Sequence, residues 1–167
     1  LQQRELDGAL VVQKTDLFYF AATAQQGWLY VPAAGEPLLM VFKEYERARS
    51  ESALPNIVSI ASPKKIPQAI GDLGLPMPAQ LGMELDVLPA NLYFQYQSIF
   101  GLAKIIDIST EIRLTRAVKS AYEIDLVRKA CALSDKVAAR VPELLEAGKT
   151  EVQLAGEIEA YARSLGH

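Results

Sequence analysis

Short apolar runs separated by turn residues fill the front of this chain, whereas a longer helical periodicity fills the rest. Short runs that are rich in β-branched residues are typical of buried strands. On this pattern we expect strands at residues 8–13, 27–31, 37–42, 56–61, 80–85 and 104–108. The connection at residues 32–36 contains both proline and glycine. The second and third runs should therefore pair as a hairpin.

Helix-forming stretches lie between the later strands. Residues 43–52 carry helix formers with charge on most faces, which predicts a surface helix. Two prolines interrupt the short helix expected at residues 63–73, because proline lacks the N–H that a helix interior needs. Pro89 suits the first turn of a helix at residues 89–100. A hairpin followed by alternating strands and helices favours an α/β fold, with a mixed sheet of about six strands and flanking helices.

After about residue 115 the pattern becomes helical alone. Ser120 and Glu123 form a capping box, in which each side chain can accept a hydrogen bond from a backbone N–H of the first turn. Apolar residues then recur at three- and four-residue spacing through Leu145, which predicts one amphipathic helix. Pro142 should kink or restart this helix, and Gly148 should end it.

A second capping box, at Thr150 and Gln153, predicts a further helix that Gly166 should end. The fold class is therefore α/β followed by a helical carboxy-terminal segment. Acidic and basic residues are balanced and mixed along this segment. We interpret them as solvated helix faces rather than a partner site.

Composition and charge exclude several classes of protein. Half of the 167 residues are apolar, 22% are charged and the net charge is −3, so a nucleic-acid-binding basic stripe is not expected. No apolar run approaches the roughly 20 residues that span a bilayer, so no membrane partner is expected. Cys131 is the single cysteine and cannot form an internal disulfide. These features favour a cytoplasmic location.

The chain lacks the residues of a self-sufficient active site. His167 is the only histidine and stands at the chain end, where it is a poor base for a catalytic triad. One cysteine and one histidine cannot supply a zinc site. The glycines at residues 71 and 74 lack the lysine and the spacing of a phosphate-binding loop.

Carboxylates are the remaining candidates. Glu84 and Asp86 stand two residues apart at a predicted strand end, where side chains on one face could share a metal ion. The alternative, which we favour, is a strand end that turns into solvent. We interpret Asp16 as the cap of a helical turn rather than as an acid catalyst.

The remaining reactive or aromatic side chains are interpreted as packing residues. Cys131 lies within the apolar helical stripe, and a reactive thiol would need an electropositive, accessible setting. Trp28 and the aromatic run at residues 18–20 are expected mostly in the core. No residue of the chain is thus assigned a catalytic, cofactor-binding or metal-binding role.

Residues 116–124 read Arg-x-x-Lys-Ser-x-x-Glu-Ile and are followed by Arg128-Lys129-Ala130. This segment resembles the one that joins the amino-terminal domain to the metal-binding "pita-bread" domain in creatinase, prolidase and Xaa-Pro aminopeptidases. Gly148-Lys149-Thr150-Glu151, with Leu154 and Ala155, resembles the segment that follows in the same family.

The resemblance extends upstream in the right order. Residues 6–12 resemble the family's opening strand, residues 81–84 its Ile-Gly-x-Glu strand, and residues 106–109 its x-Asp-x-Ser strand before the linker. One departure is Ala21-Ala22-Thr23, which replaces a glycine turn of the family.

This resemblance implies a ribonuclease-H-like amino-terminal domain of the creatinase type at residues 1–115. It implies that residues 116–167 are the linker and the first helices of a truncated catalytic domain. The family holds two divalent metal ions (Mn, Co or Zn) with two Asp, one His and two Glu, and these ions activate a bridging water. All five ligands lie downstream of the two linker helices, so we expect no cofactor in this chain.

The resemblance therefore implies the non-catalytic amino-terminal domain of an Xaa-Pro dipeptidase, an aminopeptidase or a creatinase-like amidohydrolase. Such a domain contributes to a homodimer and to active-site access, with a peptide or small amide as the substrate of the full-length protein. The chain alone should be inactive. The alternative is a structural or interaction module from a pita-bread relative that has lost its metals. The sequence beyond His167 discriminates between the two.

Overall fold

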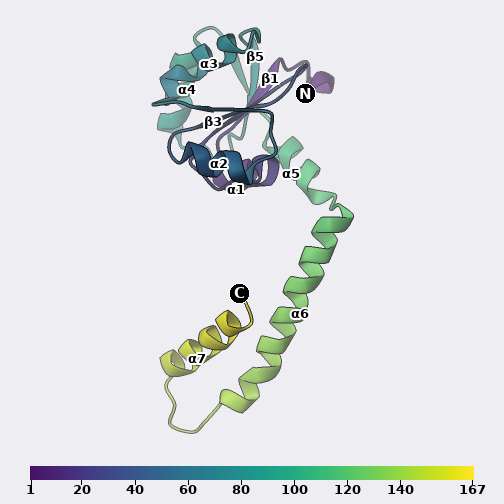
Figure 1. Cartoon of the computed structure of the whole chain (residues 1–167), viewed down its shortest axis with the longest axis vertical. Helices are drawn as coiled ribbons and strands as arrows, with labels where there is room; N and C mark the ends of the chain where they lie inside the picture. The colour runs from purple at the N-terminus through teal and green to yellow at the C-terminus, as the bar shows by residue number, and fades with distance from the viewer. The chain divides into compact units, whose positions relative to one another are not determined.

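A computed structural model describes residues 1–167, apart from the side chain of Gln3. The chain forms two compact units, Leu1–Thr115 and Arg116–His167. Figure 1 shows the first unit as a sheet with helices packed on it and the second as helices alone.

The first unit is built on a six-stranded sheet in the order β4-β3-β2-β1-β5-β6. Its strands are β1 Gly8–Val11, β2 Gly27–Pro32, β3 Leu38–Val41, β4 Asn56–Ser59, β5 Gln80–Met83 and β6 Lys104–Asp107. Strand β2 is antiparallel to both of its neighbours, and the other pairs are parallel. The predicted hairpin and mixed sheet are confirmed. Strands β1, β4 and β5 each end two residues before the predicted end. The last two residues of each apolar run belong to the loop that follows the strand.

The helices of both units follow in chain order. They are α1 Lys14–Ala21, α2 Tyr45–Glu51, α3 Ile66–Asp72, α4 Ala90–Phe100, α5 Ser109–Ala117, α6 Ala121–Leu144 and α7 Glu151–Ser164, with 3₁₀ turns at Gln2–Arg4 and Pro63–Lys65. Helix α5 was not predicted, and α1 is two turns long where a single helical turn was expected. The helix expected at residues 63–73 divides into a 3₁₀ turn and α3.

Helices cover both faces of the sheet, which explains its continuous apolar strands. In β3, Leu38 and Met40 face a core shared with α3 and α4, whereas Leu39 and Val41 face a second core shared with α1, α2 and α5. All four residues of this strand are fully buried. Figure 1 shows α3 and α4 on one side of the sheet and α1 and α2 on the other.

The turn at Ala21-Ala22-Thr23 has a left-handed backbone at Ala22. Ala22 follows α1 with φ 59°, and its N–H donates a 2.8 Å hydrogen bond to the carbonyl oxygen of Phe18. A left-handed backbone crowds the Cβ of an L-residue, so Ala22 carries strain that glycine would not.

The second unit consists of α6 and α7. Both predicted capping boxes form, at Ser120 with Glu123 and at Thr150 with Gln153. Pro142 does not restart the helix, because α6 continues through it to Leu144. The prediction that Gly148 ends α6 is wrong, since the helix ends before it.

Cys131 is exposed, contrary to the prediction that it packs in a core. The physical reason is that an apolar stripe is buried only where another element packs on it, and α7 is the helix that contacts α6 in this unit. Helix α6 has no buried residue among those that the structure describes.

Candidate functional site

A pocket of about 540 Å³ lies at one edge of the sheet in the first unit. It occupies the edge where β1, β3, β4 and β5 end and β2 begins. In open α/β sheets, the crevice outside the carboxyl ends of the strands is the usual ligand site. Its wall is formed by Val12, Gln13, Gln26, Gly27, Trp28, Phe42, Ala61, Ser62, Pro63, Val87, Leu88, Pro89, Leu92, Gln95 and Tyr96.

The chemistry of this pocket is apolar and neutral. Its polar side-chain groups are three glutamine amides, one serine hydroxyl, and the Trp28 N–H and Tyr96 hydroxyl that bond to each other. None of the described side chains that line it is charged. A Cβ at Gly27 would lie 2.2 Å from the carbonyl oxygen of Met40, so the close approach of β2 and β3 requires glycine there. Such a surface suits an uncharged peptide segment or a neighbouring protein surface better than an ionic ligand.

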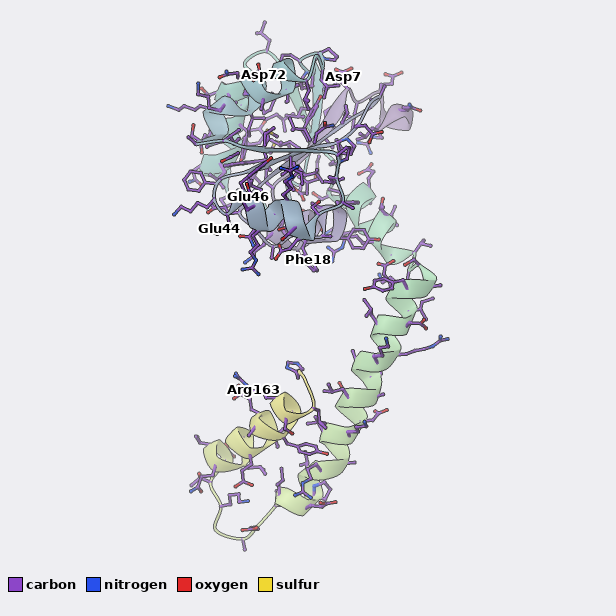
Figure 2. The ribbon with its side chains drawn as sticks, viewed as in Figure 1. Asp7, Phe18, Glu44, Glu46, Asp72 and Arg163 are labelled. Carbon is purple, nitrogen blue, oxygen red and sulfur yellow. The ribbon has the colours of Figure 1, made fainter. Side chains whose placement is uncertain are left out.

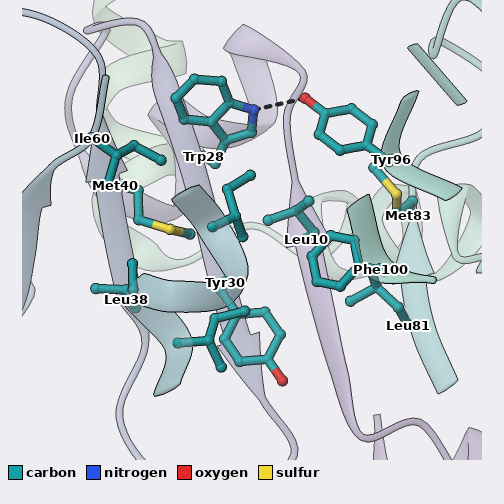
Figure 3. Packing of buried hydrophobic residues seen from close by; sticks show 13 residues of the cluster. Leu10, Trp28, Tyr30, Leu38, Met40, Ile60, Leu81, Met83, Tyr96 and Phe100 are labelled. Atoms are coloured by element: carbon teal, nitrogen blue, oxygen red, sulfur yellow. Dashed lines mark hydrogen bonds between the residues drawn. The ribbon is translucent and has the colours of Figure 1, made fainter. Parts of the chain in front are cut away.

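One side of the pocket is fixed by a buried hydrogen bond between Trp28 and Tyr96. The indole Nε1–H of Trp28 donates to the phenolic oxygen of Tyr96 at 2.7 Å (Figure 3). Both side chains are buried, as predicted for Trp28. The bond links β2 to α4 across the core, which holds the aromatic wall rigid.

Glu84 lies beside this wall and is 1% exposed, so the prediction that it turns into solvent is wrong. Its Oε2 accepts a 2.9 Å hydrogen bond from the backbone N–H of Val12, whereas its buried Oε1 has no partner. Burial raises the pKa of Glu84 to about 7, against the hydrogen bond from Val12 and with an added rise from the Asp16 carboxyl.

Asp16 is the second buried carboxyl of this region, at 7% exposed. It does not cap α1 as predicted. The Gln13 side chain does so by accepting a 2.8 Å hydrogen bond from the Asp16 backbone N–H. Asp16 lies in the first turn of α1, and its side chain reaches that of Glu84.

Asp86 is the other carboxylate that was weighed as a metal ligand. It forms a 2.7 Å ion pair with Arg113. Close by, Asp107 accepts hydrogen bonds from the hydroxyl and the N–H of Ser109, and these hold the pKa of Asp107 below its usual range. These carboxylates fix loop ends and do not converge on one point.

The remaining predicted residues are scattered. His167 is exposed at the end of the second unit. In the aromatic run expected in the core, Phe18 is 55% exposed and lies on the outer side of α1 (Figure 2). Within the described part of the chain, no group of three or more His, Cys, Asp or Glu could hold a metal ion. None of the described helices is long and apolar enough to cross a membrane.

Sequence reasoning missed the buried contacts that shape the pocket. Trp28 and Tyr96 lie 68 positions apart, and no local pattern pairs them. Gln13 is an unusual capping residue and gave no signal. The resemblance of residues 81–84 to a strand of the family was the one indication in the sequence that Glu84 differs from an ordinary exposed carboxylate.

Known proteins with similar sequences include several that are named as dipeptidases. Residues 1–118 match the Creatinase/Prolidase N-terminal domain family. The Xaa-Pro dipeptidase of Pyrococcus furiosus is 24% identical over 170 residues, which cover 99% of this chain and 46% of that protein. The probable dipeptidase PepE of Mycobacterium bovis is 28% identical over 174 residues, which cover 97% of this chain and 45% of that protein. The chain thus spans about half the length of these relatives.

Solved structures of the same kind share the fold. The Xaa-Pro dipeptidase from Bacillus anthracis has a TM-score of 0.87 at 21% identity, over 99% of this chain and 46% of that one. Dipeptidase PepE from Mycobacterium ulcerans has a TM-score of 0.78 at 28% identity, over 99% of this chain and 47% of that one.

Proposed function

Because this chain belongs to the creatinase/prolidase N-terminal domain family, we propose that it is the non-catalytic front part of a metal-dependent Xaa-Pro peptidase or related amidohydrolase. One observation carries the proposal. Relatives named as dipeptidases align with nearly all of this chain but with less than half of their own length. The rest of their length leaves room for a catalytic domain.

In this proposal residues 1–115 are the accessory domain, and residues 116–167 are the linker and the first helices of the catalytic domain. The division of the chain into Leu1–Thr115 and Arg116–His167 supports this assignment. So does the capping box at Ser120, which starts a helix just after the division. The exposed apolar residues of α6 are those expected of a helix that belongs to a larger core.

The metal ions of such a peptidase would lie outside this chain. A two-metal hydrolase needs converging carboxylates and a histidine to hold its ions and activate water. The described residues do not fit that requirement, since Asp86 and Asp107 bind Arg113 and Ser109 instead. The Mn²⁺, Co²⁺ or Zn²⁺ ions would therefore be held by residues downstream of His167.

The accessory domain would act by contact rather than by chemistry. The neutral, apolar pocket beside Trp28 supports a role in docking against another protein surface, and in narrowing access to a peptidase site. We also propose a homodimer, in which such contacts are made with a second copy. A cytoplasmic location fits a fold that contains one cysteine and needs no disulfide.

The test begins with the coding sequence beyond His167. The proposal expects an ordered series of Asp, Asp, His, Glu and Glu there. Calorimetric titration of the longer protein with Mn²⁺ should then show tight binding of two ions, and residues 1–167 should show only weak binding. A continuation without that series would contradict the peptidase assignment and leave an interaction module.

A further inference from the structure

We propose that Glu84, buried beside the carboxyl of Asp16, binds a proton and acts as a latch, fastening the β1–α1 turn to the end of β5 and setting the shape of the pocket beside Trp28. This inference is independent of the peptidase assignment, because it concerns only residues of the first unit.

The burial of both carboxyls favours a proton on Glu84. Glu84 is 1% exposed and Asp16 is 7% exposed. Two ionised carboxylates have no hydrogen to share, and their like charges repel when both are buried. The unpartnered Oε1 of Glu84 is costly as a buried charged oxygen, and protonation removes that cost. A single proton turns a repulsive pair into a hydrogen-bonded one.

Among the described residues, the groups that act on Glu84 include no cation. Asp16 approaches from α1 and Tyr96 from α4, with the backbone N–H groups of Val12 and Gln13 from the turn between β1 and α1. Arg113, a cation of α5, forms its ion pair with Asp86. Glu84 therefore becomes neutral by binding a proton. Its pKa of about 7 places that event within the physiological range.

The latch is connected directly to the pocket. Val12 donates to Glu84, and the Gln13 side chain accepts from the N–H of Asp16. Both Val12 and Gln13 also line the pocket, as do the bonded pair Trp28 and Tyr96. When the proton is lost, repulsion should move Asp16 and the first turn of α1 away from β5, and the Val12–Gln13 wall should move with them.

Trp28 is the only tryptophan of the chain and lies in this pocket, so its fluorescence reports the event. The experiment follows Trp28 emission and its quenching by acrylamide from pH 5 to pH 9 in the 167-residue chain. A His167→Gln background removes the only histidine. We expect one transition with a midpoint near pH 7, with greater quenching on the alkaline side.

Two variants assign the transition to the pair. Glu84→Gln should abolish it, because the amide keeps the shape and a hydrogen-bond donor but does not titrate. Asp16→Asn should move the midpoint to lower pH, because the Asp16 charge helps to raise the pKa of Glu84. Asp86→Asn is the control and should leave the midpoint in place. Far-UV circular dichroism checks that each variant is folded. If Glu84→Gln does not fold, the shift of the midpoint in Asp16→Asn tests the pair by itself.

Several results would overturn the latch. These are a flat titration in the parent chain, a transition that survives Glu84→Gln, or a midpoint that Asp16→Asn does not move. A transition in emission with no change in acrylamide quenching would refute the link to the shape of the pocket.

Discussion

The backbone N–H of Val12 donates a 2.9 Å hydrogen bond to Oε2 of Glu84, which lies 72 residues further along the chain. The bond joins the ends of β1 and β5, two parallel neighbours in the sheet. It places an acidic side chain inside the protein with only part of its hydrogen-bonding capacity used. The stability of the first unit should therefore depend on pH.

Glu84→Gln tests this dependence. Burial raises the folded-state pKa of Glu84 from 4.5 to about 7, so between these values the folded state holds a proton that the unfolded state has lost. The free energy of unfolding should then fall as pH rises through this window, by roughly 1.4 kcal/mol per pH unit and about 3 kcal/mol in all. Urea denaturation at pH 4.5 and pH 8 measures the change.

In Glu84→Gln this part of the pH dependence should disappear, whereas the exposed-site control Asp86→Asn should keep it. Equal pH dependence in the parent chain and in Glu84→Gln would show that Glu84 is not the titrating group.

Ala22→Gly should stabilise the protein. Ala22 has φ 59°, which costs an alanine about 1–2 kcal/mol, while glycine adds about 0.5–1 kcal/mol of unfolded-state entropy. The net gain should be on the order of 0.5–1 kcal/mol in urea denaturation. Ala21→Gly is the matched control. That residue is buried and helical, so the same change should destabilise by about 1 kcal/mol. Destabilisation by both changes would mean that Ala22 is unstrained.

Ser120→Ala should weaken the start of α6. The Ser120 hydroxyl accepts from the N–H of Glu123, and the Glu123 carboxylate accepts from the N–H of Ser120. Removing the cap should cost on the order of 1 kcal/mol, seen as faster amide exchange over residues 121–124. Ser134→Ala, in the exposed middle of the same helix, is the control and should not speed exchange there. Unchanged exchange in Ser120→Ala would mean that the cap contributes nothing.

The exposed apolar face of α6 should drive self-association. Ile124 is 40% exposed, and Val127, three residues further along and on the same face, is 52% exposed. Burying such side chains is worth roughly 1.5–3 kcal/mol each. Light scattering at micromolar concentration should give about twice the chain mass of 18.3 kDa. Val127→Glu should lower the mass toward one chain, and Lys129→Gln should not. A monomer in the parent chain would contradict this expectation.

Much of the fold could be predicted because it follows local patterns. Apolar runs such as residues 37–42 contain the fully buried strand β3, whose two faces meet two helix layers. The Ser120 and Thr150 boxes predict helix starts from four residues each. Helix α5 escaped prediction because it is short and polar, and Ile112 is its only buried apolar residue among those described.

The site could not be predicted because it depends on contacts between distant residues. Glu84 follows a strand and was expected in solvent. It is buried instead beside Val12 and Asp16, which lie about 70 positions earlier in the chain. Cys131 shows the opposite error. Its spacing in an apolar stripe predicts burial, but periodicity does not say whether the partner that buries the stripe is present.

Hydrolysis of an Xaa-Pro dipeptide tests the central claim most directly. It should be measured side by side for residues 1–167 and for the same chain continued through its downstream sequence, each with Mn²⁺, Co²⁺ or Zn²⁺. The account predicts no turnover by residues 1–167 and chelator-sensitive turnover by the longer protein. Steady, chelator-sensitive turnover by residues 1–167 alone, or none by the longer protein, would contradict it.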